Sequence, residues 1–291
     1  MTSTSPSAED PAEDPADVTG TGAADLAPAP APAPRPGTTG RTAAVVTGGT
    51  AGIGREFAEQ LAARGLDLVL VARDEARLAE AADQLARRHG VHVETLAADL
   101  ADRADVDRVA ARLADPARPV GWLVNNAGFG LKERFLDADV EAEQAMLDVL
   151  VTAVLRLTHA ALPGMVERGG GTVVNVSSVA AFLPRGTYGA AKAWVNRFGV
   201  WAAQEYGPRG VRVTTVCPGF VRTEFHGRMG VERGSAPRAL WLQPEVVVRE
   251  SLAAVEANRA LVVPTRRYRA LVGLARAVPT PVLLRFQRLG R

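Results

Sequence analysis

The residues best suited to chemistry are a tyrosine and a lysine four positions apart, Tyr188 and Lys192. They stand in a stretch of helical composition, Tyr188–Tyr206, in which residues four apart project from one helix face. A free phenol titrates at about pH 10, and an adjacent lysine cation favours its phenolate form. Tyr188 could then exchange a proton with a carbonyl or alcohol oxygen, to which Ser178 would hydrogen-bond.

The same two residues have a plainer interpretation, as a half-buried aromatic and a solvated helix lysine. The chain contains three tyrosines and only two lysines, Lys132 and Lys192. A Tyr-x-x-x-Lys pair would therefore arise by chance in only ~2% of such chains. The spacing favours the chemical interpretation.

A glycine-rich turn lies between the first predicted strand and a predicted helix. It reads Thr47-Gly48-Gly49-Thr50-Ala51-Gly52-Ile53-Gly54. Glycines let the backbone turn tightly and approach a pyrophosphate, which the free N–H groups of a helix N-terminus can bind. The alternative is a tight turn without a ligand, but the strand–turn–helix setting favours dinucleotide binding.

With these motifs in this order, the chain resembles the short-chain dehydrogenase/reductase family from Arg41 to Val263. The resemblance implies that Ser178, Tyr188 and Lys192 are catalytic and that the protein is a homo-oligomer. It also implies that Asn125-Asn126-Ala127-Gly128 lines the cofactor site, that Asp99-Leu100 contacts adenine, and that Pro218-Gly219 with Thr223 closes over the nicotinamide. The predicted cofactor-binding residues are Thr47, Gly48, Thr50, Gly52, Ile53, Gly54, Arg73, Asp99, Leu100, Asn126, Ala127, Gly128, Tyr188, Lys192, Pro218, Gly219 and Thr223.

The end of the second predicted strand favours NADP(H), with NAD(H) as the alternative. An acid there would bind the ribose hydroxyls of NAD, whereas an arginine accommodates a 2′-phosphate. This chain has Ala72 at the position of the acid and Arg73 after it. Two other interpretations remain: Arg73 pairs with a nearby acid at a helix start, and Asp99 is a helix N-cap.

The chain departs from the family pattern at two places. Leu150 stands where relatives carry an asparagine that supports a water chain from the catalytic lysine, although a backbone carbonyl could hold that water instead. Ser178 precedes Tyr188 by ten residues, a shorter spacing than in many relatives, and Ser177 is the alternative serine. The function predicted is NADPH-dependent interconversion of a ketone or aldehyde and an alcohol. The alternative is a nucleotide-binding scaffold or regulatory protein in which Leu150 impairs catalysis.

The elements that must position these residues alternate between strands and helices. Apolar runs predict strands at Ala43–Thr47, Asp67–Ala72, His92–Ala97, Val120–Asn125, Thr172–Val176, Val211–Val216 and Ala260–Val263. Helices are predicted at Gly54–Arg64, Asp74–His89, Asp105–Ala114, Ala142–Leu162 and Tyr188–Tyr206. This order predicts an α/β fold with a doubly wound parallel sheet of about seven strands, in which ligands bind at the carboxyl ends of the strands.

Composition divides the chain into three parts. Residues 1–40 hold eight of the 19 prolines, which predicts a disordered extension. Residues 41–264 are predicted to form the catalytic domain. Residues 265–291 contain seven arginines and no acid, and are predicted to form a basic extension. Between the two extensions 26 basic residues balance 26 acidic ones, which argues against nucleic-acid binding. The basic extension could instead touch an anionic membrane surface, pack on the protein or contact another subunit.

The remaining features point to a reducing, cytoplasmic setting. Cys217 is the only cysteine, and no signal peptide or stretch of about eighteen uninterrupted apolar residues is present. His159 and His226 lack partners at metal-ligand spacing, so no metal site is predicted. An apolar pocket wall for the small-molecule substrate is predicted after Pro218, although its members could equally be packing residues; they are Phe220, Phe225, Met229 and Trp241.

Overall fold

A computed structural model of the protein describes Met1 and residues 42–184, 186–224 and 237–278. The segment predicted to be disordered is residues 1–40, and all of it except Met1 lies outside the described residues. So do Phe225, His226 and Met229, together with residues 279–291 of the predicted basic extension.

The described residues contain one seven-stranded parallel sheet with the strand order β3-β2-β1-β4-β5-β6-β7. The chain order reverses between β1 and β4, which places a ligand crevice at their carboxyl ends. The doubly wound sheet predicted from the sequence is therefore confirmed. Its strands are β1 (Ala43–Thr47), β2 (Asp67–Ala72), β3 (Val93–Ala97), β4 (Val120–Asn125), β5 (Gly171–Val176), β6 (Val211–Val216) and β7 (Leu261–Val262).

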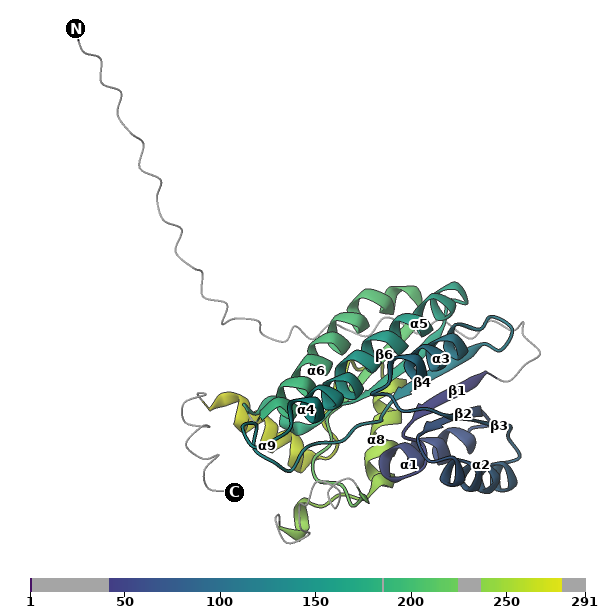
Figure 1. The fold of residues 1–291 in the computed structure, drawn as a ribbon, viewed down its shortest axis with the longest axis horizontal. Helices are drawn as coiled ribbons and strands as arrows, with labels where there is room; N and C mark the ends of the chain where they lie inside the picture. The colour runs from purple at the N-terminus through teal and green to yellow at the C-terminus, as the bar shows by residue number, and fades with distance from the viewer. Residues whose placement is uncertain (2–41, 185, 225–236, 279–291) are drawn as a thin grey trace. The chain divides into compact units, whose positions relative to one another are not determined.

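Helices cover both faces of this sheet (Figure 1). Residues of β1 alternate between the two faces, because successive side chains of a strand point in opposite directions. Ala44 and Val46 join the buried cluster formed with α1 (Gly52–Ala62), α2 (Glu75–His89) and α8 (Pro244–Glu256). Ala43 and Val45 join the cluster formed with α3 (Arg103–Ala114), α5 (Ala153–Glu167) and α6 (Gly186–Tyr206). Burial on both faces explains why the strands read as continuous apolar runs.

The helix predicted at Ala142–Leu162 is longer than expected. It comprises α4 (Val140–Leu147), a π-helical turn η1 (Asp148–Thr152) and α5, which continues to Glu167 with Pro163 inside it. The predicted end before Pro163 was wrong because packing on the sheet holds the helix past the proline. By length and composition this helix could cross a membrane, but Leu157, Ala161 and Met165 are buried in the core.

Two helices near the C-terminus were not predicted. α8 begins with Pro244 and packs against α1, and α9 (Arg266–Ala277) follows β7. Through Tyr268 and Val272, α9 joins a small buried cluster that also contains Cys217 and Val263. Part of the predicted basic extension is therefore a helix packed on the catalytic domain.

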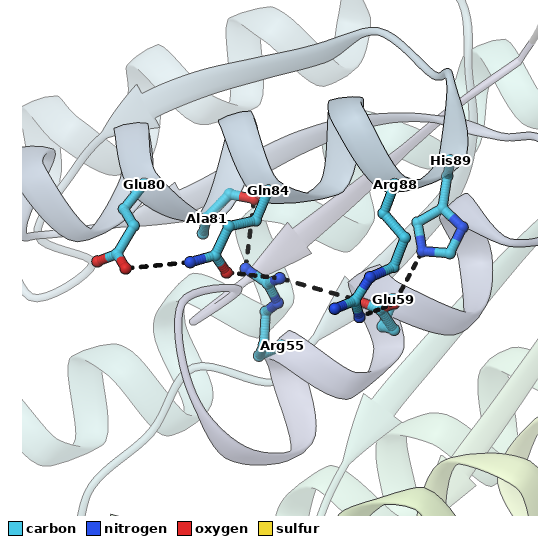
Figure 2. A network of polar contacts seen from close by, with 7 residues as sticks. All are labelled: Arg55, Glu59, Glu80, Ala81, Gln84, Arg88 and His89. Carbon is cyan, nitrogen blue, oxygen red and sulfur yellow. Dashed lines mark hydrogen bonds and ion pairs between the residues drawn. The ribbon is translucent and has the colours of Figure 1, made fainter.

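Side-chain contacts join α1 to α2, the two helices that begin beside the crevice (Figure 2). The Arg55 guanidinium donates to the carbonyl oxygen of Ala81 at 3.3 Å and to Gln84 at 3.2 Å. Glu59 accepts from Arg88 at 2.7 Å and contacts His89 at 2.8 Å. These contacts fix the direction of α2, and hence of its first turn, relative to the glycine-rich turn.

We expect one glycine to be essential to the packing of α6 on the sheet. A Cβ atom at Gly199 would overlap the buried Thr215 hydroxyl of β6, so Gly199→Ala should lower the free energy of unfolding by about 2 kcal/mol. A Cβ atom at Gly273 in α9 would point into open space. Gly273→Ala should therefore leave the free energy of unfolding unchanged or raise it by up to ~1 kcal/mol. Urea unfolding of both variants measures the two free energies of unfolding. Equal values for Gly199→Ala and Gly273→Ala would contradict the prediction.

Candidate active site

One cavity in the described structure lies at the carboxyl ends of β1, β2, β4, β5 and β6. Its volume is about 580 Å³, within the range of about 300–1,000 Å³ that is usual for ligand and cofactor sites. All predicted catalytic and cofactor-binding residues line it except Thr47 and Gly54. Lining residues that the sequence did not single out include Arg77, Phe129, Val149, Val221 and Glu224.

The glycine-rich turn has a backbone that only glycine accommodates well. Gly48 and Gly52 have φ angles of +66° and +54°, in the left-handed region. A Cβ atom at Gly52 would also lie 2.8 Å from the Thr223 methyl carbon. Glycine therefore allows the turn to approach the segment after β6 closely, and both segments line the cavity.

Thr47 and Gly54 support this turn from beneath. The buried Thr47 hydroxyl donates to the Val124 carbonyl oxygen at 3.2 Å and accepts from the N–H groups of Asn126 and Ala127 at 2.9 and 3.0 Å. A Cβ atom at Gly54 would overlap the Gly48 carbonyl oxygen, so glycine is needed there for close packing. Both were predicted as cofactor-binding residues, but they lie behind the cavity wall because the turn itself covers them.

The Asn125-Asn126 motif joins neighbouring strands. The Asn125 amide donates to Asn175 of β5 at 2.9 Å and to Thr158 of α5 at 3.1 Å. The Asn126 amide donates to the Thr47 carbonyl oxygen at 2.8 Å. The motif therefore holds the sheet together at the crevice, while Asn126, Ala127 and Gly128 line the cavity.

Ser178, Tyr188 and Lys192 meet at one end of the cavity. The Lys192 ammonium lies 5.9 Å from the centroid of the Tyr188 ring and donates to the Val176 carbonyl oxygen at 2.7 Å. Ser178 begins the short helix η2 (Val179–Phe182) and hydrogen-bonds the Tyr188 hydroxyl. The Ser177 hydroxyl instead donates to the Lys192 carbonyl oxygen at 3.0 Å, so Ser178 is the serine that faces the phenol.

Burial dominates the protonation of this pair. It raises the pKa of Tyr188 to about 12, against the opposing effect of the Ser178 hydrogen bond. Burial also lowers the pKa of Lys192 to about 8. We expected the lysine cation to favour phenolate; the largest influence in this structure is burial, which favours the neutral phenol. A protonated phenol is suited to donating a proton.

Leu150 adds to the apolar surroundings of Lys192. It is fully buried on the π-helical turn η1 and packs with Met146, Ala191 and Tyr188. A Cβ atom at Gly128 would lie 2.7 Å from the Leu150 methyl group and 3.8 Å from the Lys192 ammonium. Leu150 and Lys192 therefore both lie close to Gly128, and Leu150 presents hydrocarbon where the family pattern has an asparagine.

Charged residues gather at the opposite end of the cavity. Ala72 is the last residue of β2, as expected, and Arg73 follows it. The Arg73 guanidinium lies 3.9 Å from the Asp99 carboxylate, so the predicted cofactor residue also pairs loosely with an acid. Asp99 is not the N-cap of α3, because Asp102 has that role; Asp99 accepts instead from the Ala101 N–H at 3.0 Å.

Two of the four residues expected to form an apolar pocket wall, Phe220 and Trp241, lie outside the cavity lining, and the other two are not among the described residues. Phe220 and Trp241 contact each other with ring centroids 5.4 Å apart, and neither lines the cavity. Phe220 packs on the cluster around Cys217 and Tyr268. In the described residues the apolar part of the cavity includes Phe129, Val149 and Val221.

Tyr268 is a positioning residue that the sequence did not reveal. Its buried hydroxyl accepts from the Phe220 N–H at 2.9 Å and donates to the Leu240 carbonyl oxygen at 2.8 Å. Its ring fills the space that a side chain at Gly219 would need. Tyr268 therefore holds Gly219 and both ends of the segment between Phe220 and Leu240, but only the three-dimensional structure brings α9 to that segment.

The strained backbone at Thr265, where α9 begins, orients Tyr268. Thr265 has a φ of +71°, which costs a non-glycine residue of order 1–3 kcal/mol. Its N–H donates to the Glu250 carboxylate at 2.8 Å, and its hydroxyl accepts from the Tyr268 N–H at 3.5 Å. Contacts on both sides of Thr265 thus maintain a backbone turn that directs Tyr268 beneath Gly219.

Comparisons with known proteins found a matching family model and several similar proteins. A family model described as short chain dehydrogenase matches residues 42–233. A very-long-chain 3-oxoacyl-CoA reductase of Anas platyrhynchos is 34% identical over 220 residues, 73% of this chain and 68% of the relative. Sulfoacetaldehyde reductase 2 of Chromohalobacter salexigens is 36% identical over 240 residues, 77% of this chain and 94% of the relative. A solved short-chain dehydrogenase of Sphingobium yanoikuyae in complex with NADPH is 35% identical, with a TM-score of 0.74 over 81% of this chain and 94% of that one.

Tyr268→Phe should separate positioning from bulk stability. Removing the hydroxyl removes one hydrogen bond from the Phe220 N–H and one from the Leu240 carbonyl oxygen, at a cost of about 1–3 kcal/mol, and should lower kcat/KM about tenfold. The matched control is Tyr206→Phe, because Tyr206 contacts Trp201 and Arg209 through its ring. Kinetics are measured where both variants are fully folded, and equal kcat/KM values would refute the positioning role.

Proposed function

The chain belongs to the short-chain dehydrogenase/reductase family, and on that premise we propose that this oxidoreductase uses NADPH to reduce a ketone or aldehyde to an alcohol, reversibly. The observation that carries the proposal is that one cavity contains the Ser178, Tyr188 and Lys192 side chains at one end and Arg73 at the other. The printed names of two relatives and the NADPH complex of a third support the same reaction class.

The residues present suit the cofactor. The left-handed glycines of the first turn leave the space that a pyrophosphate needs, and the guanidinium of Arg73 suits a 2′-phosphate. Residues after β4 and β6 would hold the nicotinamide end, namely Asn126, Ala127, Gly128, Pro218, Gly219 and Thr223. When bound, NADPH supplies the hydride.

The protein supplies the proton and the orientation. Ser178 donates a hydrogen bond to the substrate oxygen, and the protonated Tyr188 hydroxyl gives that oxygen its proton. Lys192, whose pKa burial lowers to about 8, is cationic at neutral pH and balances charge as the tyrosine loses its proton. Because the cation is lost above that pH, reduction should slow there while the phenol remains protonated.

For the substrate we infer an apolar carbonyl compound. Phe129, Val149 and Val221 line the cavity that contains Tyr188, and burying apolar surface there contributes about 25 cal/mol per Å². The relatives bear names with different substrates, a long-chain acyl thioester and a small sulfonated aldehyde. A panel of ketones and aldehydes of increasing chain length distinguishes these two kinds of substrate.

We propose a cytoplasmic homo-oligomer with a weak membrane contact through the C-terminal helix. Trp201 of α6 and Leu155 of α5 are exposed apolar side chains on neighbouring helices, which favours burial against another subunit. On α9, Leu271 and Leu274 are exposed together with several arginines, which favours an anionic surface.

Tyr188→Phe tests the proton transfer. The variant should bind NADPH with unchanged affinity, measured by cofactor fluorescence, and lose at least about 10²-fold in kcat on any carbonyl substrate. The alternative function, a scaffold in which Leu150 impairs catalysis, predicts NADPH binding with no turnover that depends on Tyr188. That result would refute the reductase proposal.

Leu150→Asn tests the apolar surroundings of Lys192. A polar side chain in place of hydrocarbon should raise the pKa of Lys192 by reducing its desolvation. The pH above which kcat/KM falls should therefore move upward from about 8, and turnover at pH 8–9 should rise. The matched control is Leu157→Asn, in the same helix but facing the sheet, which should lower stability without moving the pH profile. An unmoved profile in Leu150→Asn would show that this position does not affect the lysine.

A further inference from the structure

An ion pair spans the cavity at its charged end. The Arg77 guanidinium donates to both oxygens of the Glu224 carboxylate, at 2.8 and 3.1 Å. Arg77 belongs to the first turn of α2, and Glu224 follows Thr223 in the segment after β6. Both residues line the cavity. The pair therefore connects the two sides of the crevice, which lie 147 residues apart in sequence.

Arg77 is oriented by its helix and not by the ion pair alone. Asp74 caps α2 by accepting from the Arg77 N–H at 3.0 Å, and the α1–α2 contacts of Figure 2 hold the helix in place. Arg73 precedes the same cap and lines the same cavity. Two guanidinium groups therefore face the end of the cavity next to Ala72, where the sequence pattern favours a 2′-phosphate.

The contact with Glu224 shows that Arg77 can bind an anion through both terminal nitrogens of its guanidinium. A planar guanidinium binds a carboxylate or a phosphate through the same two parallel N–H···O bonds. The Glu224 carboxylate carries one negative charge, whereas a phosphate monoester carries about −1.5 to −2. A phosphate that also contacts Arg73 would thus interact with Arg77 more strongly than Glu224 does.

We propose that Arg77 is a second specificity residue for the 2′-phosphate of NADPH and that Glu224 occupies its guanidinium until the phosphate replaces it. The inference rests on the proposed NADPH preference and deepens it. Arg73 pairs with Asp99 only loosely, at 3.9 Å, so it needs little rearrangement to bind the phosphate. Binding of the 2′-phosphate must break the Arg77–Glu224 pair, whereas binding of NADH would leave this pair intact.

The experiment measures binding of two small probes, adenosine 2′,5′-bisphosphate and 5′-AMP, by calorimetry on the full chain. The two probes differ only by the 2′-phosphate. Arg77→Gln should weaken the bisphosphate about tenfold and leave 5′-AMP within twofold. Glu224→Gln should tighten the bisphosphate about threefold, again without affecting 5′-AMP. The matched control is Arg87→Gln, which breaks the surface pair with Asp83 on the same helix and should change neither affinity.

Each outcome decides the inference. Equal loss of both probes in Arg77→Gln would mean that the residue only supports the fold, and unchanged affinities in both variants would mean that the pair is not involved. If Arg73→Gln abolishes the preference for the bisphosphate while Arg77→Gln leaves it unchanged and Glu224→Gln does not increase it, the NADPH proposal stands and this inference fails. If the unaltered protein shows no preference, both fail.

Discussion

Hydrogen bonds between the ends of β1 and β4 determine where the cleft opens. The Thr47 hydroxyl and the Asn126 amide bind the backbone of the opposite strand at the point where the strand order reverses. Gly54 lets the first turn of α1 pack directly on this junction. The glycine-rich turn, the Asn126-Ala127-Gly128 segment and the residues after β6 can face one cavity only because this junction is fixed.

The two ends of the cavity differ in polarity, and this difference separates their roles. At one end, burial raises the pKa of Tyr188 and lowers the pKa of Lys192, and Leu150 packs against Tyr188 there. At the other end, exposed arginines and acids are solvated and can exchange partners at low cost. A low-polarity end suits proton transfer to a carbonyl oxygen, and a charged end suits recognition of a phosphate.

Segments distant in sequence complete the site. α9 follows the last strand, yet its Tyr268 packs against Gly219 on the cavity wall. The strained backbone at Thr265 orients Tyr268 toward Gly219. Glu224 reaches across to Arg77 from the segment that Tyr268 holds at both ends. The position of the wall near the nicotinamide end therefore depends on a helix outside the strand–helix repeat.

The amino-acid sequence was sufficient to predict the strands, the parallel doubly wound sheet and the candidate reactive residues, because buried strands read as apolar runs and most of these candidates follow them directly. β1, β2, β4 and β6 match their predicted bounds. The tertiary structure decided what depends on surroundings: that Ser178 and not Ser177 faces Tyr188, that Thr47 and Gly54 lie behind the cavity, and that Arg77 and Tyr268 belong to the site. Burial, pKa shifts and contacts between distant segments arise only when the chain is packed, so local patterns did not reveal them.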